Sequence, residues 1–262
     1  MIKLDLAGKT ALVCGSSQGI GRASAHVLAE HGATVVLLAR NATRLKAVLQ
    51  ELPAHDRQQH SMLVADFSEP NAVATVVESI ATQQPVHILV NNTGGPPGGP
   101  ITQAEPQAFA DAFQQHLLCN HVLVQAVLPK MKDAAYGRII NIISTSVKQP
   151  LANLGVSNTI RAAVGNWAKT LANEVGRYGI TVNNVLPGAT RTARLNAIIE
   201  QKAERTGQTI AAVEAAMKAE IPAGRFADPV ETAAAVAFLA SPAAAYINGI
   251  NLPVDGGRTR SL

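Results

Sequence analysis

Three glycines near the start of the chain are spaced to hold a phosphate group. They stand in Gly15-Ser-Ser-Gln-Gly-Ile-Gly21, between the apolar run Thr10–Cys14 and a stretch with helical spacing at residues 22–31. Glycine lets a chain turn sharply, lets backbone approach a pyrophosphate, and lets a helix pack closely on a strand. The N-terminus of the helix then offers unpaired N–H groups to the anion, so we expect a dinucleotide here, a purely structural turn being the alternative. The expected contacts are Gly15, Ser16, Ser17, Gly19, Ile20 and Gly21.

The end of the next apolar run, residues 33–39, indicates which dinucleotide binds. No carboxylate stands at residues 38–41 to accept hydrogen bonds from the ribose hydroxyls of NAD. Arg40 stands there instead, and a guanidinium pairs bidentately with phosphate. The sequence therefore favours NADP over NAD, with a solvated surface arginine as the alternative.

These residues need a scaffold, and the chain alternates strand and helix patterns throughout. Continuous apolar runs are typical of strands buried on both faces of a parallel sheet. The expected strands are residues 10–14, 33–39, 62–65, 87–90, 138–143, 180–185 and 249–254; the expected helices are 22–31, 45–52, 71–82, 105–132, 157–175 and 231–239. We predict an α/β fold with a doubly wound parallel sheet, a Rossmann fold, as one domain over residues 1–262. The segment at about 190–223 is expected to form two helices that cover a ligand.

At this point the chain resembles the short-chain dehydrogenase/reductase family, in particular its 3-oxoacyl-(acyl-carrier-protein) reductases. The segment Cys14–Gly21 is similar to the family's Thr-Gly-x-x-x-Gly-Ile-Gly turn, and Asn91-Asn-Thr-Gly94 is similar to its Asn-Asn-Ala-Gly motif. Pro187-Gly188 and Val254-Asp-Gly-Gly257 resemble two further family segments. The resemblance implies an adenine contact at Asp66 and further cofactor contacts at Asn92, Gly94, Pro187, Gly188 and Thr192.

The resemblance breaks down at the residues that would move a proton. The family uses Asn, Ser, Tyr and Lys, and only the serine is matched, by Ser144. Counting on from it by the family's spacing reaches Ser157 in place of tyrosine and Arg161 in place of lysine. Counting back from Leu128-Pro129 reaches His116 in place of asparagine, although a shift of one helical turn would place Asn120 there.

The substituted residues change the chemistry that can be expected. A serine hydroxyl is a far weaker acid than a phenol, whose pKa is about 10, and arginine, with a pKa above about 12, does not exchange protons near pH 7. His116 is the expected replacement, because imidazole, with a pKa near 6.5, passes protons readily at that pH. It would act directly, through Ser157 or through water, while Ser144 orients the substrate oxygen and Arg161 anchors the ribose. A structural histidine at a polar cavity or a subunit contact is the alternative.

Two further features lie near these residues. Lys148 follows Ser144 by one helical turn and could reach the cleft, although a surface lysine is the simpler interpretation. The segment Thr93-Gly-Gly-Pro-Pro-Gly-Gly-Pro100, the glycine–proline loop, is expected to form a stiff wall beside the substrate, an ordinary rigid connection being the alternative.

Composition excludes several other classes of protein. The chain has 262 residues, 47% hydrophobic and 15% charged, with 2 cysteines, so we expect neither disorder, nor a disulfide scaffold, nor a metal site. The net charge is +4 without a run of basic residues, so no nucleic acid is expected. No apolar stretch is long enough for a membrane span and the N-terminus lacks an apolar signal core, so the expected location is the cytoplasm.

Three functions remain open. The first is an oxidoreductase that transfers hydride between NADP(H) and a small carbonyl or alcohol substrate with an atypical proton relay. The second is a non-catalytic NADP-binding protein, and the third is an imine or alkene reductase. The resemblance also implies a homo-oligomer, a tetramer or a dimer, with residues 105–132 and 157–175 at the interface.

Overall fold

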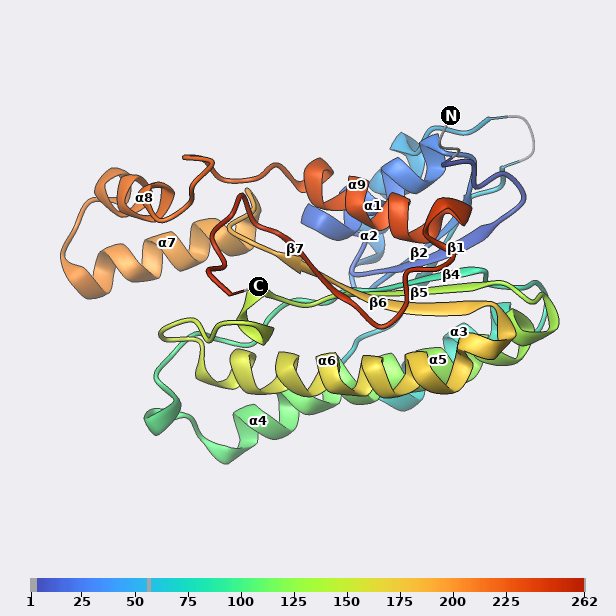
Figure 1. Ribbon diagram of the computed structural model, residues 1–262, viewed down its shortest axis with the longest axis horizontal. Helices are drawn as coiled ribbons and strands as arrows, with labels where there is room; N and C mark the ends of the chain where they lie inside the picture. Colours follow the sequence, from blue (N-terminus) through green and yellow to red (C-terminus); the bar gives the residue numbers. More distant parts are fainter. Residues whose placement is uncertain (1–3, 56–57, 262) are drawn as a thin grey trace.

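Seven parallel strands form the central sheet, in the order β3-β2-β1-β4-β5-β6-β7 (Figure 1). The structure is a computed structural model that describes residues 4–55 and 58–261. The strands are β1 Thr10–Cys14, β2 Thr34–Ala39, β3 Ser61–Val64, β4 Ile88–Asn91, β5 Gly137–Ile142, β6 Ile180–Pro187 and β7 Asn251–Val254. The strand order reverses between β1 and β4, which confirms the predicted doubly wound Rossmann sheet.

Helices cover both faces of the sheet. One face carries α1 (Gly19–Glu30), α2 (Ala42–Glu51) and α9 (Pro229–Ala240); the other carries α3 (Pro70–Ala81), α4 (Pro106–Phe113), α5 (Cys119–Asp133) and α6 (Gly155–Val175) (Figure 1). Helices α7 (Ala193–Thr206) and α8 (Ile210–Ala219) follow the carboxyl end of β6 and form the two predicted pieces of the segment at 190–223. Short 3-10 turns occupy Ile101–Gln103, Thr145–Val147, Gly176–Tyr178 and Pro242–Ala244.

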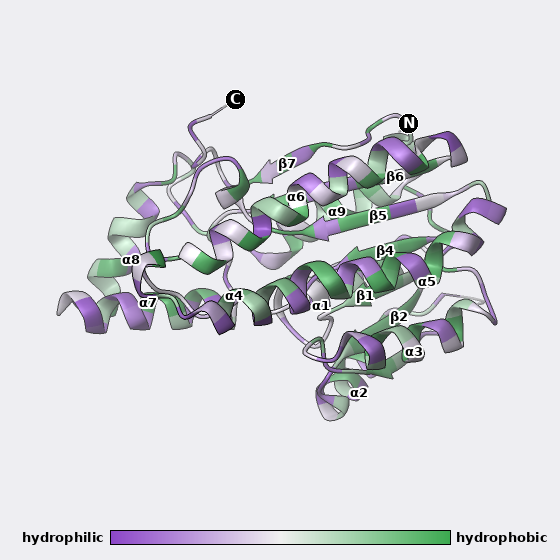
Figure 2. Cartoon of the chain, turned by 90° about the horizontal axis from the view of Figure 1, so that it is seen from below, coloured by the Kyte–Doolittle hydropathy of each residue, from purple (hydrophilic) through white to green (hydrophobic). Residues whose placement is uncertain are grey.

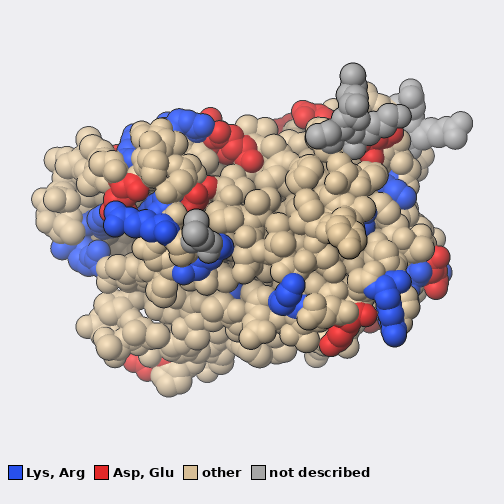
Figure 3. Space-filling model, in the orientation of Figure 1, with Lys and Arg blue, Asp and Glu red and all other residues tan. Residues whose placement is uncertain are grey.

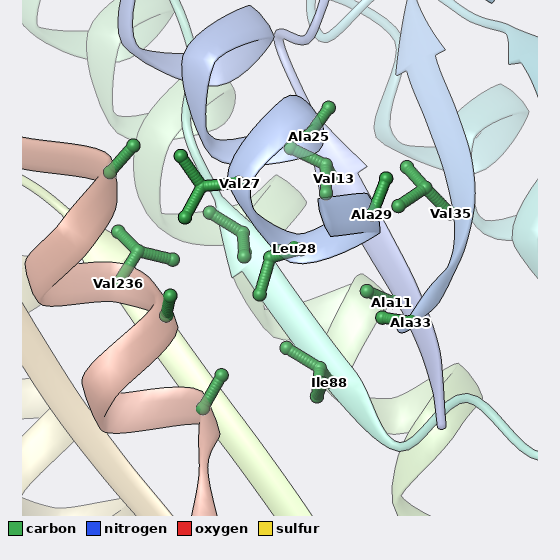
Figure 4. Packing of buried hydrophobic residues seen from close by; sticks show 14 of the residues in the cluster. Ala11, Val13, Ala25, Val27, Leu28, Ala29, Ala33, Val35, Ile88 and Val236 are labelled. Carbon is green, nitrogen blue, oxygen red and sulfur yellow. The ribbon is translucent and has the colours of Figure 1, made fainter. Parts of the chain in front are cut away.

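Alternate residues of the strands enter different cores. Ala11 and Val13 of β1 pack with α1 and α9, as Figure 4 shows, whereas Leu12 and Cys14 enter the core on the opposite face. Because successive side chains of a strand point to opposite faces, a strand buried on both sides must be apolar throughout. Figure 2 accordingly colours β1 and β4 as hydrophobic, because both of their faces are covered.

The predicted helix over residues 105–132 is interrupted. Helix α4 ends at Phe113, a π-helical turn occupies Gln114–Leu118, and α5 continues from Cys119. A π turn accommodates one extra residue in a helix and is often found at functional sites. It contains His116, which the sequence singled out as a proton carrier.

The parallel strands bring the remaining candidate residues to one edge. The glycine turn, defined as Gly15–Gly21, follows β1, Asn92 follows β4, and Ser144 lies just beyond β5. Carboxyl ends of parallel strands meet at the same edge of a sheet, where ligands of this fold class bind. Across residues 4–55 and 58–261, no helix has the length and apolar character to cross a membrane.

Candidate active site

The glycine turn has no room for side chains at its tightest points. Gly15 has a φ of +59°, and a Cβ atom added to it would lie 2.6 Å from both Nδ2 and the carbonyl oxygen of Asn92. A Cβ atom on Gly21 would collide with the carbonyl oxygen of Gly15. A Cβ atom on Gly19, at a φ of +57°, would lie 3.2 Å from Cγ2 of Thr192. At these three glycines the backbone of the turn lies too close to its neighbours for a larger residue, as is typical of a phosphate-binding turn.

The start of α1 is open to an anion. Gln18, the N-cap residue, forms no side-chain capping hydrogen bond, and the first turn holds no acidic residue. The first N–H groups of a helix lack partners within the helix, so those of this turn can bind phosphate oxygens. Asn92 fixes the turn from β4, because its Nδ2 donates to the carbonyl oxygens of Cys14 and Gly15 at 3.2 and 3.3 Å.

The three other turn residues predicted to contact the dinucleotide occupy different positions. Ser16 is fully buried, and its hydroxyl accepts a hydrogen bond from the Leu38 N–H at 3.0 Å. Its side chain therefore ties the turn to β2 instead of reaching outward. Ser17 and Ile20 are half-buried at the surface of the turn.

Arg40 and Asp66 meet at the carboxyl ends of β2 and β3. Nη1 of Arg40 lies 3.7 Å from Oδ2 of Asp66, and both side chains are well exposed. A hydrogen bond from the Ser68 N–H is the main reason that the pKa of Asp66 is lowered. A cation and an anion thus stand where the sequence placed the contacts to 2′-phosphate and adenine.

A second guanidinium lies close by and was missed by the sequence analysis. Nη1 of Arg44 donates to Oε1 of Gln18 in the glycine turn at 3.0 Å. Asn41 caps α2 by accepting from the Arg44 N–H at 2.9 Å, which holds the first turn of α2 beside the glycine turn. The N-cap pattern, asparagine followed by a helical stretch, was the available signal.

A polar pocket lies between β4, β5, α6 and the π-helical turn. Its lining residues are Asn91, Asn92, Thr93, His116, Asn120, Ile142, Ile143, Arg161 and Val164, and together they define what we call the polar pocket. His116 and Asn120, the two residues that compete for the family's asparagine position, both belong to it. Ser144 directly follows Ile143, and Ser157 lies one helical turn before Arg161 on α6. The structure therefore brings His116 and Arg161 together in the polar pocket, whereas Ser144 and Ser157 do not line it themselves.

His116 is buried and neutral in this pocket. His116 is 4% exposed, and its Nε2 has no hydrogen-bond partner among the described residues. Burial, followed by the positive charge of Arg161, lowers the pKa of His116 to about 3, while a hydrogen bond with the Gly94 backbone acts in the opposite direction. At pH 7 the imidazole is therefore neutral, with one donor and one acceptor nitrogen. The pKa near 6.5 for which the sequence favoured His116 as proton carrier is not kept in the fold, because burial disfavours the charged ring.

Arg161 is held at the end of β5. Its Nη1 donates to the carbonyl oxygen of Ile142 at 3.0 Å. Burial, followed by the charge of Arg194, lowers the pKa of Arg161 to about 10, so the group stays charged at pH 7. The nearby Ser144 hydroxyl accepts from the Ser146 N–H at 3.1 Å, which orients it at the end of the strand.

A row of asparagines crosses the sheet to this pocket, and it too was missed. Nδ2 of Asn91 donates to Asn141, Nδ2 of Asn141 to Asn184, and Nδ2 of Asn184 to Asn251, each at 2.8 Å. This amide ladder fixes the orientation of every member. Oδ1 of Asn91, at its end, is buried without a partner among the described residues, so the pocket offers an acceptor here. Asparagines within otherwise apolar strands were the available signal.

The tyrosines lie elsewhere. The Tyr136 hydroxyl donates to the carbonyl oxygen of Ala240 at 2.7 Å, the Tyr178 hydroxyl accepts from Arg177, and Tyr246 is fully exposed. None of them lines the polar pocket, so no phenol replaces the missing catalytic one there. Lys148 is half-buried just beyond the Thr145–Val147 turn and does not line the polar pocket either.

Helix α7 approaches the glycine–proline loop, residues 93–100. Thr192 caps α7, since its hydroxyl accepts from the Leu195 N–H, and Nη2 of Arg194 donates to the carbonyl oxygen of Pro96 at 2.6 Å. A Cβ atom on Gly98 would lie 3.3 Å from Oε1 of Gln201, farther along the helix. The loop is therefore enclosed by α7. Pro187 is the last residue of β6, and Gly188 follows it in the segment that precedes Thr192, the N-cap of α7. Gly188 lies close to Asp255.

Metal binding finds no support at this site. Over residues 4–55 and 58–261, no group of three His, Cys, Asp or Glu side chains could hold an ion. Both cysteines are buried and free.

Comparison with known proteins gives the family. A protein-family model described as Enoyl-(Acyl carrier protein) reductase matches residues 15–259. The chain belongs to the short-chain dehydrogenase/reductase family.

Within that family it is similar to 3-oxoacyl-[acyl-carrier-protein] reductases. The FabG enzyme of that name from Vibrio cholerae is 36% identical over 257 residues, which cover 97% of this chain and 98% of the relative. The NADPH-dependent reductase BacG of Bacillus subtilis is 30% identical over 256 residues, covering 97% and 99%. The crystal structure of L-sorbose reductase from Gluconobacter frateurii, complexed with NADPH and L-sorbose, has a TM-score of 0.91 at 30% identity and covers all of both chains.

Proposed function

We propose that this protein is an NADP(H)-dependent oxidoreductase that interconverts a small carbonyl compound and its alcohol. The observation that carries the proposal is the glycine turn, whose glycines leave no room for side chains at its tightest points, and which lies at an open helix N-terminus and adjoins the polar pocket through Asn92. BacG, which is named an NADPH-dependent reductase, and L-sorbose reductase, whose crystal structure contains NADPH, support the choice of cofactor.

The residues at the sheet edge fit the parts of NADP in turn. The pyrophosphate would bind the N–H groups of the glycine turn, and Arg40, with Arg44, would bind the 2′-phosphate. Asp66 would contact the adenine end. The nicotinamide half would lie along Asn92, Gly94, Pro187, Gly188 and Thr192. When bound, the cofactor supplies the hydride, and the protein must supply or remove the proton.

Proton movement is assigned to the polar pocket. Arg161 would anchor the ribose and keep a positive charge beside the reacting oxygen, which Ser144 orients. His116 would accept a proton on one ring nitrogen as it releases one from the other, directly, through Ser157 or through water. His116 and Asn91, whose Nε2 and Oδ1 atoms lack hydrogen-bond partners among residues 4–55 and 58–261, both line this pocket, so it has polar groups left for a ligand or water.

A second candidate function is the reduction of an imine or an activated alkene. It is favoured by the absence of a phenol from the polar pocket and by a histidine that is neutral at pH 7. A protonated imine brings its own proton, so it needs no strong acid from the protein. The third hypothesis, cofactor binding without catalysis, is a possible outcome of the same experiment.

The experiment titrates NADPH and NADH by fluorescence and then follows NADPH oxidation with ketones, imines and enones. We expect micromolar binding of NADPH and turnover of at least one ketone. Turnover confined to imines or enones would favour the second function. Binding without any turnover would favour the non-catalytic hypothesis, and failure to bind either dinucleotide would contradict all three.

We also propose that the protein forms a homo-oligomer, a dimer or tetramer, through α4, α5 and α6. Large apolar side chains are exposed along this part of the chain, with Phe113 and Leu118, at the π-helical turn, each 40% exposed, and Ile101, beside the start of α6, 55% exposed. Figure 3 shows charged side chains gathered toward the ends of one face, with few between them. Light scattering after size-exclusion chromatography tests this, and a monomer at micromolar concentration would contradict it.

A further inference from the structure

Two arginines converge on the glycine–proline loop from different helices. Arg161 comes from α6 and Arg194 from the start of α7. Nη2 of each lies 3.6 Å from the point where a Cβ atom on Gly95 would stand. The two nitrogens are therefore within twice that distance of each other, and the glycine places no side chain beside them. We call these residues the arginine pair.

Neither charge of the arginine pair is neutralised. Among residues 4–55 and 58–261, Asp and Glu side chains form ion pairs with five other arginines and with neither of these two. Arg161 and Arg194 instead donate to the carbonyl oxygens of Ile142 and Pro96, which carry no net charge. Two guanidinium groups at this separation repel each other, and Arg161 is only 9% exposed, so water screens it poorly.

The position of Arg194 on α7 makes the local potential more positive. It is the second residue of the helix, and the first turn contains no acidic residue. The N-terminus of a helix is its positive end, so a cation there is unfavourable unless an anion lies nearby. Burial and the charge of Arg194 also lower the pKa of Arg161, which indicates the same electrostatic cost.

We propose that the arginine pair binds a carboxylate group of the substrate, so that this enzyme acts on small acids that carry a reducible group. The inference rests on the proposed function and names its substrate class. Guanidinium and carboxylate form charge-assisted hydrogen bonds about 2.7–2.9 Å long, and two guanidinium groups can share the two oxygens of one carboxylate. The anion would remove the repulsion within the pair and satisfy N–H groups that now lack a charged partner. Arg161 would give Nη2 to the carboxylate and keep its other N–H groups for the ribose of the cofactor.

This placement also orients the substrate. Arg161 lines the polar pocket with His116, whereas Arg194 belongs to the first turn of α7 and donates to the carbonyl oxygen of Pro96. A carboxylate between them leaves the rest of the molecule to extend toward Ser144 and His116. The positive charge of Arg161 disfavours a proton on His116. A bound carboxylate would offset this charge, so His116 would take up a proton more readily once an acidic substrate is present.

The test uses calorimetric titration of the NADPH-saturated protein with benzoate, an unreactive acid, and with neutral benzamide. We expect benzoate to bind at least tenfold more tightly than benzamide. Arg194→Gln should weaken benzoate binding at least tenfold and Arg194→Lys by less, while NADPH affinity changes less than twofold. Arg191→Gln is the matched control: Arg191 lies just before α7, is exposed, and has its Nε 3.6 Å from Oδ1 of Asp228, so benzoate binding should not change.

A second variant guards against a folding defect. Gly95→Ala adds a methyl group 3.6 Å from both guanidinium groups, which is ordinary van der Waals contact, and keeps every charge. It should fold normally, with an unchanged melting temperature, and weaken benzoate binding severalfold by filling the space between the arginines.

Three results would overturn the inference. They are equal affinity for benzoate and benzamide, tight binding of phenyl phosphate without binding of benzoate, or a loss of NADPH affinity in Arg194→Gln that exceeds the loss of benzoate affinity. The last would assign the pair to the cofactor. Because NADPH binding is measured first, a failure of the proposed function, no NADPH binding, is distinguishable from a failure of this inference.

Discussion

The glycine turn and the polar pocket lie at the same sheet edge, and they differ in how completely their polar groups are satisfied. In the turn, Ser16 and Asn92 hold the backbone through hydrogen bonds, and glycines remove every side chain that would collide. In the pocket, His116 and Asn91 keep buried atoms for which the described part of the chain offers no partner, and Arg161 forms no ion pair there. Buried polar groups are costly when unsatisfied. The difference indicates that the side chains of the turn are satisfied within the fold, so that only backbone N–H groups are left for an anion, whereas the pocket has side-chain groups left for a ligand.

The largest effect is expected from the turn, because it has no freedom to adjust. In Gly21→Ala the new Cβ atom would collide with the carbonyl oxygen of Gly15. We expect NADPH affinity to fall by at least 100-fold and the melting temperature to drop, as fluorescence titration and thermal unfolding would show. Gly99→Ala, where a Cβ atom meets nothing within 4 Å, is the control. Normal NADPH binding by Gly21→Ala would show that the turn does not hold the cofactor.

The burial of His116 in the polar pocket should make the stability of the protein depend on pH. The folded pKa of His116 is about 3, below the value of about 6.5 in the unfolded chain. Between these values the unfolded state binds more protons than the folded state, so stability falls as pH falls through this window. At pH 4.5 the loss attributable to His116 is about 2–3 kcal/mol.

Urea unfolding at pH 7.5 and pH 4.5 measures this loss. His116→Asn should show a smaller decrease between the two pH values than the parent protein. His121→Asn, a change at an exposed histidine of α5, should decrease like the parent. Equal decreases in His116→Asn and the parent would mean that His116 is not a buried neutral group.

A smaller effect is expected at the cofactor's phosphate end, where the groups are exposed. Arg40→Ala should raise the Kd for NADPH about 10- to 100-fold, because one charged hydrogen-bonding partner is lost. The Kd for NADH should stay within about threefold of the parent value, because NADH has no 2′-phosphate. Arg205→Ala, an exposed arginine in the last turn of α7, should change neither. Parallel losses for both dinucleotides in Arg40→Ala would remove the basis for preferring NADP.

The sequence predicted the sheet and the turn well because both depend on local pattern. Apolar runs such as Thr10–Cys14 identify buried strands, and glycines between a strand and a helix identify the turn. The π-helical turn escaped notice because a single extra residue hardly alters the helical period. Ser16 was expected to contact the cofactor, yet its hydroxyl is used inside the fold, which residue type alone does not reveal.

Other parts of the site depend on contacts between distant segments. Arg194 becomes informative only when α7 is brought against Pro96, which lies far away along the chain. The amide ladder requires the register of four neighbouring strands. Such features follow from tertiary packing, so spacing along the sequence could not identify them.

The central claim is that the turn holds the cofactor while His116 in the polar pocket moves the proton. The most direct measurement compares His116→Ala with the parent protein in NADPH affinity and in the rate of NADPH oxidation with the best ketone from the panel. Proton transfer by a positioned side chain contributes about 10²- to 10⁴-fold to a rate. The account predicts an unchanged NADPH affinity and a rate at least 100-fold lower. An unchanged rate in His116→Ala would contradict it.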